Sequence, residues 1–247
     1  MSFMNWFKKK EEPTLPEVYT EEEIHALETH IQQYFGNFDS VFHEIISPDI
    51  HVDIALIKPT PARNYHILTT MGMGAHRMNV PSELAEHKLE RAELLICLPP
   101  DWRLVSNDFD VIEDDEDIDN PDSPANERWY WPLRWLKNLA RLPISGNTWL
   151  GFGHTVPNGK DAEPFAENTE LGCVILVPPV QFDKEAQICA MPDGSQVIFY
   201  QMLPLYADEM NHKLEHGTDA LLEKIIAHPA LENVLTLDIE RPSALEE

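Results

Sequence analysis

The sequence has few basic residues and no long apolar run. Its 247 residues include 18 Lys and Arg against 43 Asp and Glu, so the formal net charge is −25. A nucleic-acid-binding protein normally needs a basic face for the phosphates, and the negative charge argues against nucleic acid as a partner. The same charge argues against adsorption to anionic lipid. Because no apolar run reaches about 18 residues, we also expect no membrane span.

Cysteine is scarce as well. Cys97, Cys173 and Cys189 are scattered, and each lies in an apolar run. An odd number of cysteines without close spacing argues against a disulfide framework and against a zinc knuckle. Residues 1–10 place aromatic side chains before three lysines, which is the reverse of a secretory signal. We therefore expect buried free thiols in a reducing compartment, with the cytoplasm as the location.

What the chain does contain is enough apolar material for a folded core. Apolar residues make up 43% of the sequence, and at about 150 residues per domain the length suits one or two domains. We expect a single domain over residues 20–240. Residues 1–19 are expected to be a loose lead-in and residues 241–247 a C-terminal tail.

Several segments carry the pattern of a helix. The expected helices cover residues 20–35, 131–142, 206–216 and 219–227. Thr20 and Glu23 have the spacing of a capping box at the start of the first helix. Pro132 suits the first turn of the second helix, where its missing amide costs nothing. Gly217 is expected to end the third helix and Thr218 to cap the fourth.

Short apolar or β-branched runs between turn residues predict strands. They cover residues 41–46, 50–57, 65–70, 93–98, 148–152, 173–177, 186–191 and 196–203, with 234–239 as a possible short final strand. The run 93–98 is almost continuously apolar, which is typical of a strand covered on both faces. Gly194 favours a tight turn between 186–191 and 196–203. The order of the expected elements predicts an α+β (mixed α/β) fold: a helix, several strands, a helix, several strands and then helices.

The most unusual segment is an acidic loop expected over residues 107–126. Nine of the residues from 108 to 122 are acidic, and no basic residue lies between Arg103 and Arg128. Such dense like charges repel one another, so a mobile loop is expected. It would either keep the protein soluble or form an electrostatic contact for a basic partner. In the second case the partner-binding residues are Asp114, Asp115, Glu116 and Asp117.

A metal site deserves consideration on the expected helix 206–216. His212 and His216 lie four residues apart, with Asp208 and Glu209 one turn earlier. Residues at this spacing share one helical face. No third ligand and no His-Glu-x-x-His motif is evident in the sequence. A solvated helix face is therefore favoured over a metal site, and no metal or other cofactor is expected.

Other motifs also favour a structural interpretation. The glycine pairs in 72–74 and 151–153 lack both the third glycine and the lysine of phosphate-binding loops, so turns or bulges are favoured. No Gly-x-Ser-x-Gly motif is present, and no catalytic residue is predicted. Trp129, Trp131 and Trp135 cluster beside the acidic loop, where ordinary core packing is favoured over interface anchors.

Five segments carry a resemblance to a known family. They are HILTTMGMGAHRM (66–78), RAELLICLPPDW (91–102), WPLRWLKNLARL (131–142), NTWLGFGHTVPNG (147–159) and GSQVIFYQMLPLYADEMNHKLEHGTDALLEKI (194–226). In their order and spacing they resemble the suppressor-of-fused-like domain family over roughly residues 30 to 228. No single segment is diagnostic, because most of them are core patterns.

This resemblance implies a central mixed sheet flanked by helices, and a protein-binding module without established catalysis. In eukaryotes the domain is part of a two-domain regulator that sequesters a transcription factor in the Hedgehog pathway. Bacterial single-domain members are proposed to be immunity proteins in polymorphic toxin systems, many of them paired with nuclease-type toxins. This acidic chain is similar to the bacterial type. The acidic loop looks like an insertion relative to the family, and no partner-binding residue is carried over.

The sequence therefore predicts a cytoplasmic, non-catalytic immunity-type protein that binds and neutralises a basic toxin domain, such as a nuclease. The alternative is a regulatory or scaffold protein that binds a host protein by strand addition at a sheet edge. A third alternative is an unrecognised enzyme or metal protein. Neither the partner's identity nor the oligomeric state follows from the sequence.

Overall fold

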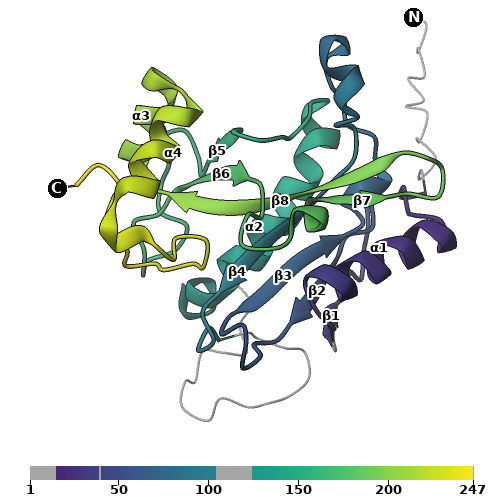
Figure 1. Ribbon diagram of the computed structural model, residues 1–247, viewed down its shortest axis with the longest axis horizontal. Helices are drawn as coiled ribbons and strands as arrows, with labels where there is room; N and C mark the ends of the chain where they lie inside the picture. Colours follow the sequence, from purple (N-terminus) through teal and green to yellow (C-terminus); the bar gives the residue numbers. More distant parts are fainter. Residues whose placement is uncertain (1–14, 39, 104–123, 247) are drawn as a thin grey trace, which may run out of the picture.

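Within the described residues, one mixed sheet of eight strands forms the centre of the molecule (Figure 1). The computed structural model describes residues 15–38, 40–103 and 124–246. The strands are β1 (Ser40–Phe42), β2 (Asp53–Ile57), β3 (His66–Met71), β4 (Ala92–Leu98), β5 (Thr155–Pro157), β6 (Cys173–Val177), β7 (Ile188–Ala190) and β8 (Gln196–Leu205). Their order in the sheet is β1-β2-β3-β4-β8-β6-β5, and β7 pairs with β8 beside this path. The central pair β4–β8 is parallel, while the other pairings described are antiparallel. The expected α+β class is therefore confirmed.

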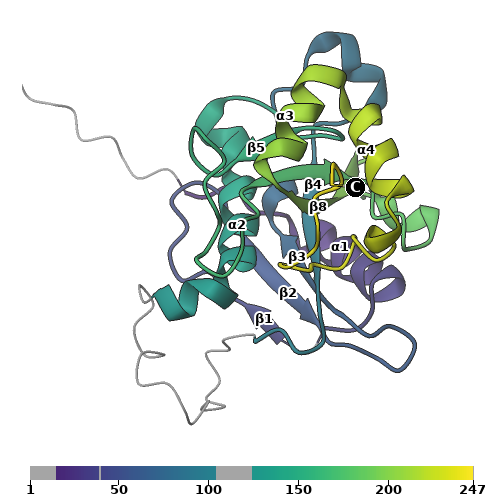
Figure 2. The ribbon, with the colours of Figure 1, turned by 90° about the vertical axis from the view of Figure 1, so that its left-hand side faces the viewer.

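Helices cover both faces of the sheet (Figure 2). The α-helices are α1 (Glu21–Tyr34), α2 (Pro124–Gly146), α3 (Ala207–His216) and α4 (Thr218–Ala227), and the short 3₁₀ helices are η1 (Met73–Ala75), η2 (Ser82–His87), η3 (Lys184–Gln187) and η4 (Pro229–Leu231). Strand side chains alternate between faces, and β8 shows the consequence. Phe199 packs in the cluster with α1, Leu205 in the cluster with α3 and α4, and Met202 in the cluster with α2. Helix α2 thus covers one face, whereas α1 and the α3–α4 pair cover two parts of the other.

The first helix and its capping box are confirmed. The Thr20 hydroxyl accepts a hydrogen bond from the Glu23 amide, and the Glu23 carboxylate accepts one from the Thr20 amide. Leu27, Ile31 and Phe35 are buried against the sheet. The local sequence sufficed here because the cap and the apolar stripe both lie within the helix.

The expectation for the second helix was wrong about Pro132. Helix α2 begins at Pro124, and Pro132 lies inside it. A proline inside a helix removes one hydrogen bond and costs about 3 kcal/mol or more. The carbonyl of Arg128, four residues earlier, instead accepts a hydrogen bond from the Asn168 side chain at 3.5 Å. Burial of Trp131 and Leu136 against the sheet offsets the cost, and such burial is not readable from the local sequence.

Most of the expected strands overlap observed ones, but two do not. Residues 148–152 form no strand, because the chain turns at Gly153 (φ 77°) and β5 begins only at Thr155. Residues 234–239 form no strand either. They contribute one isolated parallel bridge, between Thr236 and Cys97, in which the Leu237 amide donates to the Cys97 carbonyl at 2.8 Å. β8 pairs with β4 up to Leu95, and the C-terminal segment thus pairs with β4 beyond that residue.

The caps of the last two helices agree with expectation in part. Gly217 (φ 94°) ends α3 as expected, and it is also the N-cap of α4. The expectation that Thr218 caps α4 was wrong, because Thr218 is the first residue inside the helix. Residues 1–14 of the expected lead-in lie outside the described residues. Near the expected domain boundaries, Tyr19 hydrogen-bonds the buried Glu93, and Arg241 is itself buried.

Burial of the three thiols is confirmed. Cys97, Cys173 and Cys189 are buried and unpaired. Burial raises the pKa of Cys97 and of Cys173 to about 12 and that of Cys189 to about 11. Among the described residues, no helix is both long enough and apolar enough to cross a bilayer.

Candidate functional site

The glycine pair in 72–74 binds a carboxylate of the chain itself. Glu93 lies on β4 and is fully buried. Its Oε1 atom accepts hydrogen bonds from the amides of Gly72 at 3.0 Å and Gly74 at 3.1 Å, and from the Tyr19 hydroxyl at 2.7 Å. The Thr70 hydroxyl donates to Oε2. The two amides that would cradle a phosphate are therefore occupied internally, and both glycines serve a structural turn.

Arg91 completes this buried network. Its Nη1 atom lies 2.7 Å from Glu23 on α1, and its Nε donates to the Gly74 carbonyl at 2.6 Å. The guanidinium also lies over the Tyr19 ring, 5.2 Å from its centroid. Burial raises the pKa of Glu93, although the four donors counteract this. The network joins the N-terminal segment, α1 and β4.

The two histidines considered as metal ligands lie side by side on α3. The rings of His212 and His216 are 4.5 Å apart, beside a shallow hollow lined in part by Glu223 of α4. The neighbouring acids are engaged elsewhere. Asp208 accepts a hydrogen bond from the Ser243 hydroxyl at 2.7 Å, and Glu209 is buried in an ion pair. Within the described part of the chain, no three His, Cys, Asp or Glu side chains are grouped so that they could hold a metal ion.

Two of the three clustered tryptophans belong to the core, as expected. Trp131 stacks on Phe165 with ring centroids 4.6 Å apart, and Trp135 meets the same ring edge-on at 4.7 Å. Trp129 differs from them. It is only partly buried, and it packs edge-to-face against Trp102 with centroids 5.1 Å apart.

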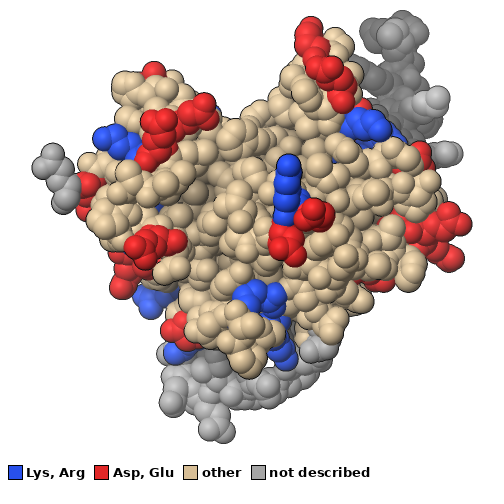
Figure 3. Space-filling model, viewed as in Figure 1, with Lys and Arg blue, Asp and Glu red and all other residues tan. Residues whose placement is uncertain are grey.

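On the face of the molecule seen in Figure 3, Lys, Arg, Asp and Glu lie mostly toward the margins of the view. Around one small charged cluster, a wide area shows no Lys, Arg, Asp or Glu. Although the chain has a net charge of −25, carboxylates are thus unevenly distributed over this face. A hollow in which carboxylates and apolar side chains meet is a candidate binding site.

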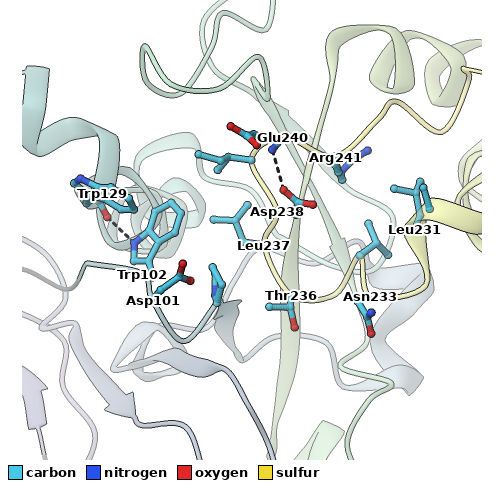
Figure 4. A pocket seen from close by; sticks show the side chains of 14 residues that line it. Asp101, Trp102, Trp129, Leu231, Asn233, Thr236, Leu237, Asp238, Glu240 and Arg241 are labelled. Atoms are coloured by element: carbon cyan, nitrogen blue, oxygen red, sulfur yellow. Dashed lines mark hydrogen bonds between the residues drawn. The ribbon is translucent and has the colours of Figure 1, made fainter.

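One such place is a pocket of about 480 Å³ between the end of β4, the start of α2 and the C-terminal segment (Figure 4). Its walls are both apolar and acidic. The apolar side chains are Trp102, Trp129, Leu231, Val234, Leu237 and Ile239, and the acidic ones are Asp101, Asp238 and Glu240. Figure 4 shows the two indoles on one side of the pocket and the C-terminal segment on the other.

Each of the two walls is fixed in place by its own hydrogen bonds. On the first wall, the Trp102 indole donates to the Trp129 carbonyl at 2.9 Å, which joins the end of β4 to α2. On the second, the Gln201 side chain donates to the Leu235 carbonyl, and the Arg241 guanidinium binds Glu209. The backbones of β4 and the C-terminal segment pair at the Cys97–Thr236 bridge described above. The pocket therefore lies in a gap between segments that are each fixed to the sheet or to a helix.

The pocket carries negative charge, and among the described residues no Lys or Arg forms an ion pair with it. Asp101, Asp238 and Glu240 are exposed at its rim. Arg241 also lines the pocket, but its charge is compensated by Glu209. In the parts of the chain that are described, no Lys or Arg lies within ion-pair distance of the three rim carboxylates. Arg103 lies nearby, over the Trp129 ring at 5.3 Å.

The predicted partner-binding residues lie outside the described residues. They are Asp114, Asp115, Glu116 and Asp117, within residues 104–123. In the sequence, two pocket residues lie on either side of this segment: Trp102 precedes it and Trp129 follows it. In the sequence, the acidic segment thus lies between Trp102 and Trp129, two residues of one pocket wall.

Sequence reasoning missed the pocket residues Asp101, Asp238 and Glu240. A partial signal was present, because Trp102 ends a segment that carries the family resemblance. The run 234–239 suggested only a strand. Nothing in the sequence indicated that Asp101 and Asp238 share a hollow, because the fold alone brings them together.

The edges of the sheet were the alternative binding surface. The terminal strands in the sheet order are β1 and β5, and each has three residues. Strand β5 contains Pro157, which has no amide to donate to an added strand. Short strands and proline are features that discourage pairing at a sheet edge.

Comparisons with known proteins agree with this fold. Residues 48–242 match the family model described as "Suppressor of fused protein (SUFU)". A suppressor of fused homolog from Neisseria gonorrhoeae is similar with a TM-score of 0.60 and 17% identity, over 92% of this chain and 100% of that one. The Sufu–Fu complex gives 0.57 and 15%, over 93% of each chain, and Drosophila Suppressor of Fused gives 0.54 and 17%, over 90% of this chain and 51% of that one. At these identities the likeness shows the fold alone. A comparison with curated protein sequences finds no match.

Proposed function

Because the chain belongs to the suppressor of fused family, we propose that it is a non-catalytic protein-binding module of the immunity type. Its partner is a basic toxin domain, such as a nuclease, which it binds and neutralises. One of the similar structures is described as the Sufu–Fu complex, so this fold supports a protein complex in at least that case.

The observation that carries the proposal is the pocket lined by Trp102, Trp129 and the C-terminal segment. It combines buried indole surface with three rim carboxylates, and the acidic segment connects two of its lining residues. An apolar centre supplies most of the affinity in protein interfaces, while complementary charge sets rate and specificity. A concentrated negative surface raises association rates with a cationic protein by roughly 10 to 10³-fold at low salt.

The absence of catalysis is supported by the state of the candidate reactive groups. The three thiols have pKa values of about 11 to 12, so they are protonated at neutral pH and are poor nucleophiles. The buried carboxylates of Glu93 and Glu209 are occupied by internal donors. Buried, unpaired thiols also suit the reducing cytoplasm, where we place the protein.

The test begins with capture of partners from the native organism at low and moderate salt, identified by mass spectrometry. The candidate is then purified and titrated against this protein by calorimetry, and its toxic activity is measured with and without one equivalent. We expect a basic protein, one-to-one binding that weakens with salt, and loss of toxic activity. An acidic partner, or full activity of the saturated complex, would contradict the immunity role.

The edge-strand alternative and the metal alternative are tested with the same material. Binding by strand addition would depend on the backbone of β1 or β5 and would tolerate changes in the pocket. Metal analysis of the purified protein, with and without His212→Ala, tests the histidine pair on α3. Stoichiometric metal that disappears in the variant would overturn the assignment of a solvated face.

A further inference from the structure

The pocket has the chemistry of a site for one long cationic side chain. Its volume of about 480 Å³ is within the range of pockets that enclose a small ligand, about 300–1,000 Å³. Leu237 and Ile239 line it on one side and the indoles of Trp102 and Trp129 on the other. Arginine and lysine bury their methylene stems along such apolar surfaces while the charged head stays at a polar rim.

The rim would meet that head with negative charge. Asp238 and Glu240 lie on the C-terminal wall, and Asp101 lies on the loop after β4 (Figure 4). Asp238 also accepts a hydrogen bond from the Glu240 amide at 2.9 Å, which fixes this carboxylate on the rim. Arg241 cannot neutralise them, because both of its Nη atoms bind Glu209, at 2.7 and 2.6 Å.

The aromatic wall favours arginine over lysine. Trp129 already takes one guanidinium of this chain, since Arg103 lies over its ring at 5.3 Å from the centroid. The edge-to-face contact with Trp102 holds the two rings in fixed orientations. A planar guanidinium can stack on an indole and bind a carboxylate with two parallel hydrogen bonds, whereas an ammonium is a point charge with stronger hydration.

We infer that this pocket binds a single arginine side chain of the protein partner, presented on an extended segment with apolar neighbours. The inference rests on the proposed protein-binding function and names the group that the pocket recognises. The stem would lie between Leu237 and the indoles, and the guanidinium would reach Asp238 and Glu240 at the rim.

The direct test uses a capped tripeptide, acetyl-Leu-Arg-Leu-amide, titrated into ¹⁵N-labelled protein. Matched peptides replace arginine with lysine or with citrulline, which has the shape of arginine without its charge. We expect saturable shifts of the indole signals of Trp102 and Trp129, with little change at Trp149, which does not line the pocket. The lysine peptide should bind about threefold more weakly, and the citrulline peptide should not saturate.

Variants of the rim make the test specific. The double variant Asp238→Asn with Glu240→Gln keeps the shape and an acceptor oxygen, and should weaken the arginine peptide about threefold to tenfold. The matched control Glu223→Gln with Glu232→Gln removes two exposed carboxylates outside the pocket and should leave the affinity unchanged. Equal binding of the citrulline peptide, or unchanged affinity in the rim variant, would overturn the inference.

The two proposals can fail separately. A protein partner whose affinity is unchanged by the rim variant would leave the proposed function standing and remove the arginine pocket. An arginine peptide that saturates the pocket, when no protein partner is recovered at either salt concentration, would support the pocket chemistry and count against the immunity role.

Discussion

Glu209 on α3 and Arg241 in the C-terminal segment form a bidentate ion pair that is almost completely withdrawn from water. The side chains are 0% and 4% exposed, and their closest atoms are 2.6 Å apart. Glu209 also accepts hydrogen bonds from the amides of Tyr206 and Ala244. The pair fixes the C-terminal wall of the pocket to α3, so the position of this wall depends on Glu209, which does not itself line the pocket.

Removal of one partner from this pair should destabilise the protein strongly. Arg241→Met leaves the Glu209 carboxylate buried without its counter-charge, and we expect a loss of about 3–5 kcal/mol in the free energy of unfolding. Urea denaturation measures it. The control is Arg77→Met, because Arg77 pairs with Asp193 at a site where both side chains are about half exposed. Such a surface pair contributes about 1 kcal/mol or less, so equal losses in the two variants would contradict this account.

Gly72 should tolerate no side chain. Its φ is 136°, and a Cβ atom there would lie 1.9 Å from the His51 carbonyl oxygen. Gly194 also has a positive φ (81°), but nothing lies within 4 Å of its Cβ position. Gly194→Ala should therefore lower the free energy of unfolding only by the backbone strain, about 1 kcal/mol. Gly72→Ala adds a clash with the backbone and should lower it by more than about 3 kcal/mol. Thermal or urea unfolding distinguishes the two, and a smaller loss for Gly72→Ala would show that the His51 loop moves.

The first helix and the central strand were predictable because their signals are local. The Thr20–Glu23 capping box and the buried run of β4 need only neighbouring residues to be recognised. Pro132 was misplaced because the burial that compensates for it comes from the packing of α2 on the sheet, between residues far apart in the sequence. The pocket could not be predicted for a related reason: Asp101 and Asp238 line one pocket only after the C-terminal segment pairs with the end of β4.

His30 should make stability depend on pH in the mildly acidic range. Its ring stacks on Phe199, and its Nε2 lies 2.9 Å from the Ala186 carbonyl, to which it donates. Burial lowers the pKa of His30 from its usual value of 6.5. A lowered pKa means that the folded protein binds this proton less tightly than the unfolded chain. The stabilising contribution is therefore present above pH 6.5 and is lost as the pH falls through the lowered value.

The variant His30→Gln keeps a donor for the Ala186 carbonyl and removes the titration. Unfolding free energies measured from pH 7.5 to 5 should fall less steeply for this variant than for the natural protein. His25→Gln, at an exposed position on the same helix, should retain the natural slope. A slope that is unchanged in His30→Gln would mean that the buried ring takes up its proton without loss of stability.

The acidic segment should act on the rate of association with the partner. Replacement of Asp114, Asp115, Glu116 and Asp117 by Asn and Gln removes four negative charges from the chain segment that connects Trp102 to Trp129. Because long-range attraction accelerates encounter rather than holding the complex, the association rate at low salt should fall by about tenfold or more, with a smaller change in dissociation. The slope of the association rate against ionic strength should also become shallower.

Stopped-flow measurements with the purified partner at several salt concentrations test this. The matched control neutralises four exposed carboxylates elsewhere, Glu170, Glu185, Glu223 and Glu232, so that net charge changes equally in both variants. If the rate follows net charge alone, both variants will slow association to the same extent. If the position of the charges matters, only the first variant will lose most of the salt dependence, because its charges lie in the chain segment between Trp102 and Trp129. An association rate at low salt that is unchanged in the first variant would remove the acidic segment from the mechanism and leave the rim carboxylates as the remaining electrostatic contact.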